Sequence, residues 1–172
     1  MKATGFNHVS ISAKNLEESA RFYTEIFGLK EIPTPNFSFP VRWMRLGNLQ
    51  LHLFERDTEA PTYHHIGINV DDFEAAYAKA AELGIHDAEA FYSDIYELPD
   101  GSVQMYIRDP AGNLVEIDWP DVTMLDRSAL PGFKKLDDDV PQTGEALRAT
   151  LYLHLHEERA ASAADDEPPA KE

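Results

Sequence analysis

The segment Val103–Trp119, VQMYIRDPAGNLVEIDW, has the pattern of a strand, a tight turn and a second strand. The four residues DPAG at 109–112 predict the turn, because proline presets one backbone angle and glycine accepts a positive φ. Side chains alternate on both sides of the turn, so Val115 and Ile117 share an apolar face while Glu116 points to the other. Such a carboxylate is either an ordinary solvent-facing residue or part of a site, and the remainder of the chain decides between the two.

Composition bounds the class of protein. The 172 residues are enough for one well-buried domain with an appendage. A formal net charge of −16 argues against a nucleic-acid surface, and the absence of cysteine excludes disulfides and thiolate metal sites. Neither a signal peptide nor a run of ~20 apolar residues is recognisable, so we expect a cytoplasmic protein without a membrane partner.

The first half of the chain predicts the order β-α-β-β-β. Residues 6–12 alternate as a strand, and Asn15 with Glu18 forms a capping-box pattern before a helix that ends at Gly28. Three strands are expected to follow, at 29–32, 41–46 and 49–54, with a proline-rich loop at 33–40.

The second half repeats this order, which indicates an internal duplication. A strand at 64–70 precedes a helix capped by Asp72 and ended by Gly84, and after weak strand signal and a loop at 91–101 the hairpin closes the unit. The expected domain is 1–120, with module one at 5–56 and module two at 62–119. Beyond it we expect a partly helical extension at 121–160, loop-like over 121–140 and helical or stranded over 144–159, and a disordered tail at 161–172.

Four candidate metal ligands fall at matched strand positions in the two halves. His8 and His65 lie on the opening strands, and His52 and Glu116 lie on the closing strands. Their apolar neighbours belong to the helix-covered face, so all four side chains should face away from the helices. A lone histidine on a strand is usually a surface residue, but independent surface residues need not match in position and parity, so we predict metal binding. The remaining histidines, His86 among them, are taken as surface residues or have the wrong parity.

The motifs F-Y-x-x-x-x-G-L at 22–29 and R-D-P-A-G-N-L-V-E at 108–116, with histidines on the opening strands, resemble the vicinal oxygen chelate superfamily. This family includes glyoxalase I, methylmalonyl-CoA epimerase, fosfomycin resistance proteins, bleomycin-binding proteins and extradiol dioxygenases. The resemblance implies an α+β fold, in which two βαβββ modules form an incompletely closed eight-stranded barrel around a divalent metal, usually in a homodimer. His8, His65 and Glu116 fall on the family's ligand positions, whereas His52 stands where glyoxalase I and the epimerase carry Glu or Gln.

Three imidazoles and a carboxylate suit Zn, Ni, Co, Fe or Mn and leave two positions open for a small bidentate oxygen substrate. This donor set favours glyoxalase-like lyase or isomerase chemistry through an enediolate, with Glu116 linked to proton transfer. The alternative is an extradiol-type dioxygenase that uses Fe(II) on His8, His65 and Glu116. Tyr106 occupies the family's Y-x-x-D-P position and should face the cavity, so it is a candidate catalytic residue, but the dioxygenases' upstream histidine is missing from 98–104.

A non-catalytic, bleomycin-resistance-like binder is the third possibility, although such binders usually lack metal ligands. Trp43 and Arg45 either share the cavity face or lie on an exposed strand face. Together with Asn69 and Arg108 they are the candidate substrate-binding residues. The substrate itself is not encoded in a recognisable pattern.

Overall fold

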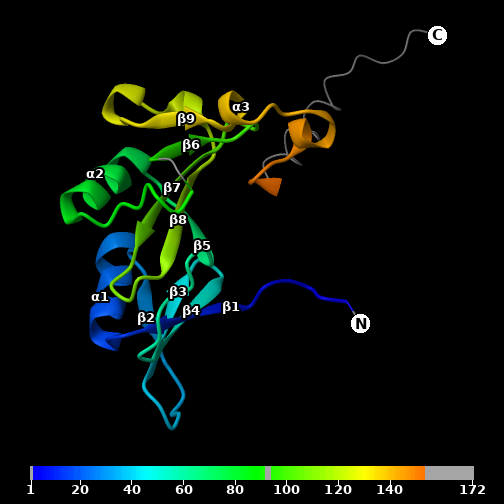
Figure 1. Cartoon of the computed structure of the whole chain (residues 1–172). Coiled ribbons are helices and arrows are strands. Elements are labelled where there is room, and N and C mark those ends of the chain that lie inside the picture. The colour runs from blue at the N-terminus through cyan, green and yellow to red at the C-terminus, as the bar shows by residue number, and fades with distance from the viewer. Residues whose placement is uncertain (1, 92–93, 154–172) are drawn as a thin grey trace.

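The computed structural model describes residues 2–91 and 94–153. The first βαβββ unit comprises β1 (His8–Ala13), α1 (Leu16–Phe27), β2 (Lys30–Ile32), β3 (Val41–Leu46) and β4 (Leu49–Glu55) (Figure 1). The second comprises β5 (His65–Asn69), α2 (Phe73–Leu83), β6 (Ile95–Glu97), β7 (Val103–Arg108) and β8 (Leu114–Trp119). The predicted α+β fold class and the duplication of the βαβββ unit are confirmed.

Each unit forms its own sheet with the same connectivity. The strand orders are β1-β4-β3-β2 and β5-β8-β7-β6-β9, where β9 (Phe133–Lys135) is an addition from the C-terminal extension. In both sheets the first and last strands of the unit pair in parallel and the remaining pairs of the unit are antiparallel. The opening and closing strands of a unit are therefore neighbours, which is why residues far apart in sequence can share a site.

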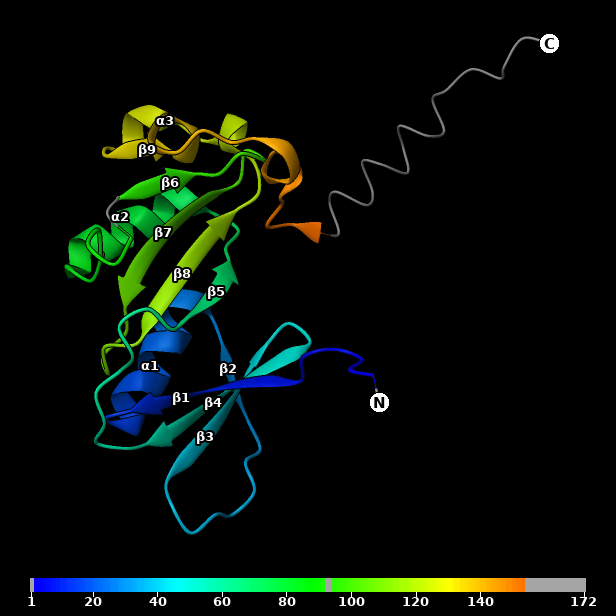
Figure 2. The ribbon, with the colours of Figure 1, turned by 45° about the vertical axis from the view of Figure 1, so that its right-hand side comes forward.

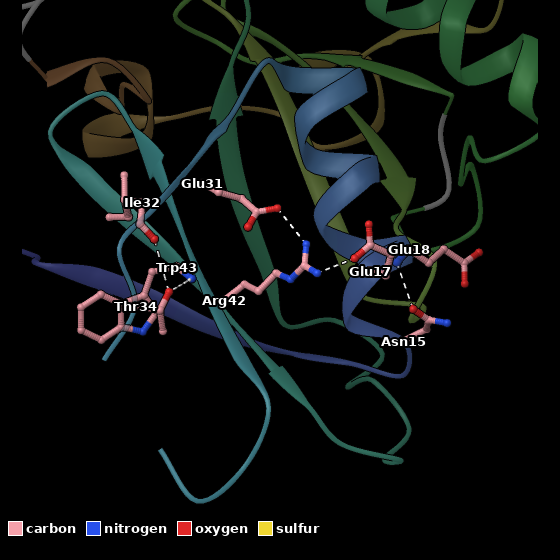
Figure 3. A network of polar contacts seen from close by, with 8 residues as sticks. All are labelled: Asn15, Glu17, Glu18, Glu31, Ile32, Thr34, Arg42 and Trp43. Carbon is pink, nitrogen blue, oxygen red and sulfur yellow. Dashed lines mark hydrogen bonds and ion pairs between the residues drawn. The ribbon is translucent and has the colours of Figure 1, made fainter. Parts of the chain in front are cut away.

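The helix boundaries follow from local capping. The Asn15 side chain accepts a hydrogen bond from the Glu18 amide at 3.0 Å, as Figure 3 shows, and α1 ends at Gly28 with φ of 66°. Asp72 caps α2 in the same way through the Ala75 amide, and Gly84 ends that helix with φ of 64°. The capping residues predicted from the sequence are confirmed.

One face of each sheet packs on its helix. Tyr23 of α1 is fully buried with Met44 of β3 and Leu53 of β4, and Phe73 of α2 is buried in the same core cluster. The alternation predicted for the strands is thus observed, and the polar and aromatic side chains of the other face remain available for a site.

Two polar links fix the first sheet to its surroundings. Arg42 of β3 donates to Glu31 of β2 at 2.8 Å and also contacts Glu17 of α1 (Figure 3). Thr34, at the start of the loop 33–40, donates to the Ile32 carbonyl at 3.3 Å and accepts from the Trp43 amide at 3.0 Å. These two hydrogen bonds hold the start of the loop next to Trp43.

The C-terminal extension differs from the sequence expectation. The segment 121–140, expected as loop, contains short 3-10 turns at Val122–Met124 and Arg127–Ala129, strand β9, and the one-turn helix α3 (Leu136–Asp139). Strand β9 pairs in parallel with β6, placing Phe133 opposite Ile95. Because β6 lies far from β9 in the sequence, no local sequence pattern predicts this pairing.

Of the segment 144–159, expected as helix or strand, the structure describes residues 144–153. A 3-10 turn covers Gly144–Arg148, and beyond it the Leu151 amide donates to the Asp100 side chain at 2.9 Å. The rest of that segment and the tail expected at 161–172 lie outside the described residues. Among the residues described, no helix has the length and apolar character that crossing a membrane requires.

Candidate functional site

A hydrogen-bonded series lies on the open face of the second sheet. Glu116 of β8 stands opposite Tyr106 of β7 and Gly67 of β5, and the residue is only 7% exposed. The Tyr106 hydroxyl donates to Glu116 Oε2 and accepts from Gln104 Nε2 at 2.7 Å. His65 Nε2 lies 3.3 Å from the same Glu116 oxygen. The predicted residues Tyr106, His65 and Glu116 therefore meet in one place.

The Tyr106 hydroxyl is a fixed proton donor in this series. Burial, together with the hydrogen bond to Glu116 and the charges of Glu116 and Asp118, raises the pKa of Tyr106 far above its ordinary value. The phenol therefore stays protonated at physiological pH. Its proton fixes one oxygen of Glu116 in place.

Asp118 is a site residue that the sequence reasoning missed. It follows Glu116 with the same strand parity, is 5% exposed, and its Oδ1 makes no hydrogen bond with any described residue. A Cβ at Gly67 would lie 2.9 Å from Asp118 Oδ2 and 3.8 Å from Glu116 Oε1, so the two carboxyls converge over this glycine. Burial and the neighbouring Glu116 raise the pKa of Asp118 well above its usual range. Parity alone could have identified this residue.

The first sheet holds the other two candidate ligands in an aromatic stack. The His52 ring lies between the rings of His8 and Trp43, with both centroid distances 4.3 Å and interplanar angles of 15° and 4°. His52 Nε2 also lies 2.9 Å from Gln50 Oε1. Burial and then the nearby His8 lower the pKa of His52, so its imidazole is kept neutral, as a metal ligand must be.

The structure thus brings the four candidate ligands together as two pairs, His8 with His52 and His65 with Glu116. In the part of the chain that is described, no group of three or more His, Asp or Glu side chains is placed to hold one ion. A cleft of about 260 Å³ between β1 and β5 is lined by Ser10, His65 and Leu114, among others. Each pair supplies two of the four predicted metal ligands, and the two pairs lie on different sheets.

The four candidate substrate-binding residues have different surroundings. Trp43 lies in the stack, Arg45 donates through Nε to the Gly47 carbonyl at 3.0 Å, and Asn69 is exposed at the end of β5. Arg108 contacts the Asp87 carboxylate at 2.6 Å and the carbonyls of Gly112 and Thr62 at 3.1 and 3.3 Å. These contacts use one N–H of each guanidinium nitrogen and tie Arg108 to the β7–β8 turn, and its role in contacting a substrate stays a prediction.

His86 also differs from the expectation of a surface residue. Its side chain is 14% exposed, and its Nε2 lies 2.9 Å from the Asp94 carbonyl. Its ring packs edge-on against Tyr77. The sequence reasoning treated it as exposed because the short strand pairing that covers it, with Ile107, has no local signal.

Comparison with known proteins identifies the family. The model of the Glyoxalase/Bleomycin resistance protein/Dioxygenase superfamily matches residues 5–117. The chain belongs to this superfamily. Its relatives include "Glyoxylase I 4" of Arabidopsis thaliana, 24% identical over 167 residues that cover 90% of this chain and 84% of that protein. The mitochondrial methylmalonyl-CoA epimerase of Homo sapiens is 33% identical over 85 residues, which cover 41% of this chain and about half (48%) of the epimerase.

The superfamily fold is also found by structural comparison. The fosfomycin resistance protein FosX of Listeria monocytogenes, in complex with Mn(II) and sulfate, superposes with a TM-score of 0.55 at 18% identity, over 68% of this chain and 93% of FosX. At this identity the likeness establishes the fold alone. A protein of this superfamily fold has therefore been seen with a divalent metal ion.

Proposed function

We propose that this protein is a metal-dependent lyase or isomerase, which moves a proton at a carbon beside a carbonyl group and acts through an enediolate. The observation that carries the proposal is the series Gln104–Tyr106–Glu116 beside His65 on the open face of the second sheet, with Glu116 itself buried. A carboxylate shielded from water, with one oxygen fixed by a phenol, is suited to accept and return a proton. The glyoxylase and epimerase names of two relatives support this reaction class.

The residues that would hold the metal are His8, His52, His65 and Glu116. Their donor set suits Zn, Ni, Co, Fe or Mn, and the Mn(II) complex of FosX supports a divalent ion. A bound divalent ion supplies Lewis-acid polarisation of a substrate oxygen. Glu116 would take the proton from carbon, while Tyr106 and Gln104 hold the carboxylate in position.

Because the two ligand pairs lie on different sheets, we further propose that a homodimer joins them. Within the described ranges, neither β1 nor β5 has a strand partner on its second edge. Open edges of this length require pairing or cover. A second chain can cover them and can bring its His65 and Glu116 to the first chain's His8 and His52.

Subunit mixing tests this arrangement. A His8→Ala chain and a Glu116→Gln chain each damage every site in their own dimers. If each site draws one pair from each chain, a mixed dimer contains one intact site, and refolding the two variants together should restore part of the metal content. If each chain builds its own site, mixing restores nothing. A monomer by sedimentation would reject the shared site directly.

Activity separates the proposed reaction from its alternative. The metal-loaded protein should convert the methylglyoxal–glutathione adduct, with solvent deuterium entering the product in D₂O where the abstracted proton exchanges. Glu116→Gln should lower kcat by about 10²–10⁴-fold, and Tyr106→Phe should lower it less. Tyr63→Phe, at an exposed position, is the matched control. Oxygen-dependent catechol cleavage by the Fe(II) protein, without conversion of any 2-oxoaldehyde adduct, would favour the extradiol-type dioxygenase instead.

A further inference from the structure

The last described segment, Thr150–Leu153, returns from the outer edge of the second sheet toward its open face. Figures 1 and 2 both place this part of the chain, drawn in orange, near the end of β8. The extension first adds β9 to the edge of β6 and then passes through the 3-10 turn Gly144–Arg148. Tyr152 therefore reaches the second sheet on a segment that lies outside the duplicated units.

Asp100, in the turn before β7, anchors this segment. Its carboxylate accepts the Leu151 amide at 2.9 Å and the Ser102 hydroxyl at 2.6 Å, and the Thr150 hydroxyl also bonds to it. The Thr150 oxygen in turn accepts the Tyr152 amide at 3.0 Å. The backbone that leads into Tyr152 is therefore oriented by specific contacts.

Tyr152 is buried at the end of the second sheet that carries Asp118. Asp100, which holds the Leu151 amide, shortly precedes Val103 of β7, and Val103 stands opposite Trp119, the neighbour of Asp118 on β8. Tyr152 is 8% exposed, although its chain neighbours Leu151 and Leu153 are 42% and 71% exposed. Burial and the charges of Asp118, Asp100 and Glu116 raise the pKa of Tyr152, so its phenol stays protonated among these carboxylates. An isolated buried tyrosine at the end of an exposed segment indicates that this one side chain was placed against the sheet.

We propose that Tyr152 is a residue of the site, which covers the Glu116–Asp118 carboxyl pair and limits the access of water and ligand to it. This placement of Tyr152 rests on the proposed function only for the identity of the bound metal ion and substrate. Excluding water lowers the local dielectric and strengthens the electrostatic effect of Glu116 on a bound ion or substrate. A phenol at this position also offers a hydrogen-bond donor to a substrate oxygen, so it would favour substrates with a polar group on this side.

Fluorine NMR of the metal-free protein tests the position of Tyr152. The seven tyrosines are labelled as 3-fluorotyrosine and assigned by single Tyr→Phe substitutions. Glu116→Gln and Asp118→Asn should each shift the Tyr152 resonance. Asp139→Asn is the matched control, because Asp139 accepts from Tyr96 at 2.7 Å on the outer edge, and it should shift Tyr96 and leave Tyr152 unchanged. A Tyr152 resonance that ignores both site substitutions overturns the proposal.

Water relaxation on bound Mn²⁺ tests the covering role. Tyr152→Ala should raise the water-proton relaxation rate per bound Mn²⁺, since it lets solvent reach the ion, whereas Tyr96→Ala should not. Tyr152→Phe should keep the low rate and instead raise KM for the glutathione adduct by up to about tenfold, the equivalent of one lost hydrogen bond. An unchanged relaxation rate in Tyr152→Ala rejects the covering role. A protein that binds no Mn²⁺ or other divalent ion rejects the proposed function, and the fluorine shifts then decide the placement of Tyr152 by themselves.

Discussion

The Tyr23 hydroxyl donates a hydrogen bond to Asp109 Oδ2 at 3.0 Å, joining α1 of the first unit to the β7–β8 turn of the second. Both residues are buried, with exposures of 0% and 4%. The other Asp109 oxygen accepts the amides of Ala111 and Asn113 at 2.9 and 2.8 Å. The Asn113 side chain completes the junction by donating to the Ser12 carbonyl of β1 at 2.8 Å. The D-P-A-G-N motif therefore shapes a turn and also ties the two units together.

Tyr23→Phe should lower the free energy of unfolding by about 1–3 kcal/mol, because it leaves a buried carboxylate oxygen short of one donor. Urea denaturation measures the change. Tyr63→Phe removes a hydroxyl from an exposed tyrosine and should stay within about 0.5 kcal/mol of the wild type. Equal effects of the two substitutions would show that the hydrogen bond between the units contributes nothing.

The junction should also give stability a distinct pH dependence. Burial raises the pKa of Asp109, although hydrogen bonds from Asn113, Tyr23 and the Ala111 amide oppose the rise. The folded protein thus holds this proton at pH values where the unfolded chain, with a pKa of about 3.9, has released it. The contribution of Asp109 is complete below that pH and is lost as pH rises through the folded pKa. The stability difference between wild type and Asp109→Asn should therefore decrease with rising pH above about 4, and a flat or rising difference would contradict this.

Asp87 should show the opposite slope. Burial disfavours its charge, but the Arg108 guanidinium and the amides of Ala90 and Glu89 lower its pKa below the ordinary value. Its contribution is therefore present above about pH 4 and is lost as pH falls through the folded pKa. We expect Asp87→Asn to destabilise the protein at pH 7 and progressively less in acid, as measured by urea denaturation. In an Arg108→Met background the same substitution should have little further effect, and additive losses would argue against a shared contact.

Metal binding should be visible in tryptophan emission. A divalent ion that binds His52 should disturb the stacked rings of His8, His52 and Trp43, because a nitrogen of the ligand imidazole has to point at the ion. Addition of Zn²⁺ should change the emission of Trp43, and Trp119→Phe should leave that change intact. Trp43→Phe and His52→Ala should each abolish it. Stoichiometric Zn²⁺ binding without any change in emission would remove His52 from the ligand set.

Local signals were enough to predict the duplicated units but not the extension. Asn15, Gly28, Asp72 and Gly84 act on their own helix ends, so their roles can be read from neighbouring residues alone. Strand parity correctly placed Tyr106 beside Glu116. The contacts that were missed all depend on segments distant in sequence, as with β9 on β6 and Asp100 on Leu151.

Two residues show how far strand parity reaches. Arg108 has the parity of a site residue, but Asp87 and two carbonyls engage its guanidinium. Asp118 has that parity too, but its burial and its approach to Glu116 over Gly67 come from the packing of the sheet. Strand alternation predicts the face of the sheet on which a side chain lies, whereas the partners that it contacts there depend on the tertiary structure.

The short outer strands have a consequence for how far copies of the chain can associate. The first sheet ends in β2 and the second in β9, each three residues long and carrying charged side chains, Lys30 and Glu31 in one and Lys134 and Lys135 in the other. Strands of this kind are poor templates for adding another chain. Two copies that join through β1 and β5 would present only these outer strands to a third copy. Edge-to-edge growth would then stop at a closed pair, which would protect the fold against filament formation along its sheets.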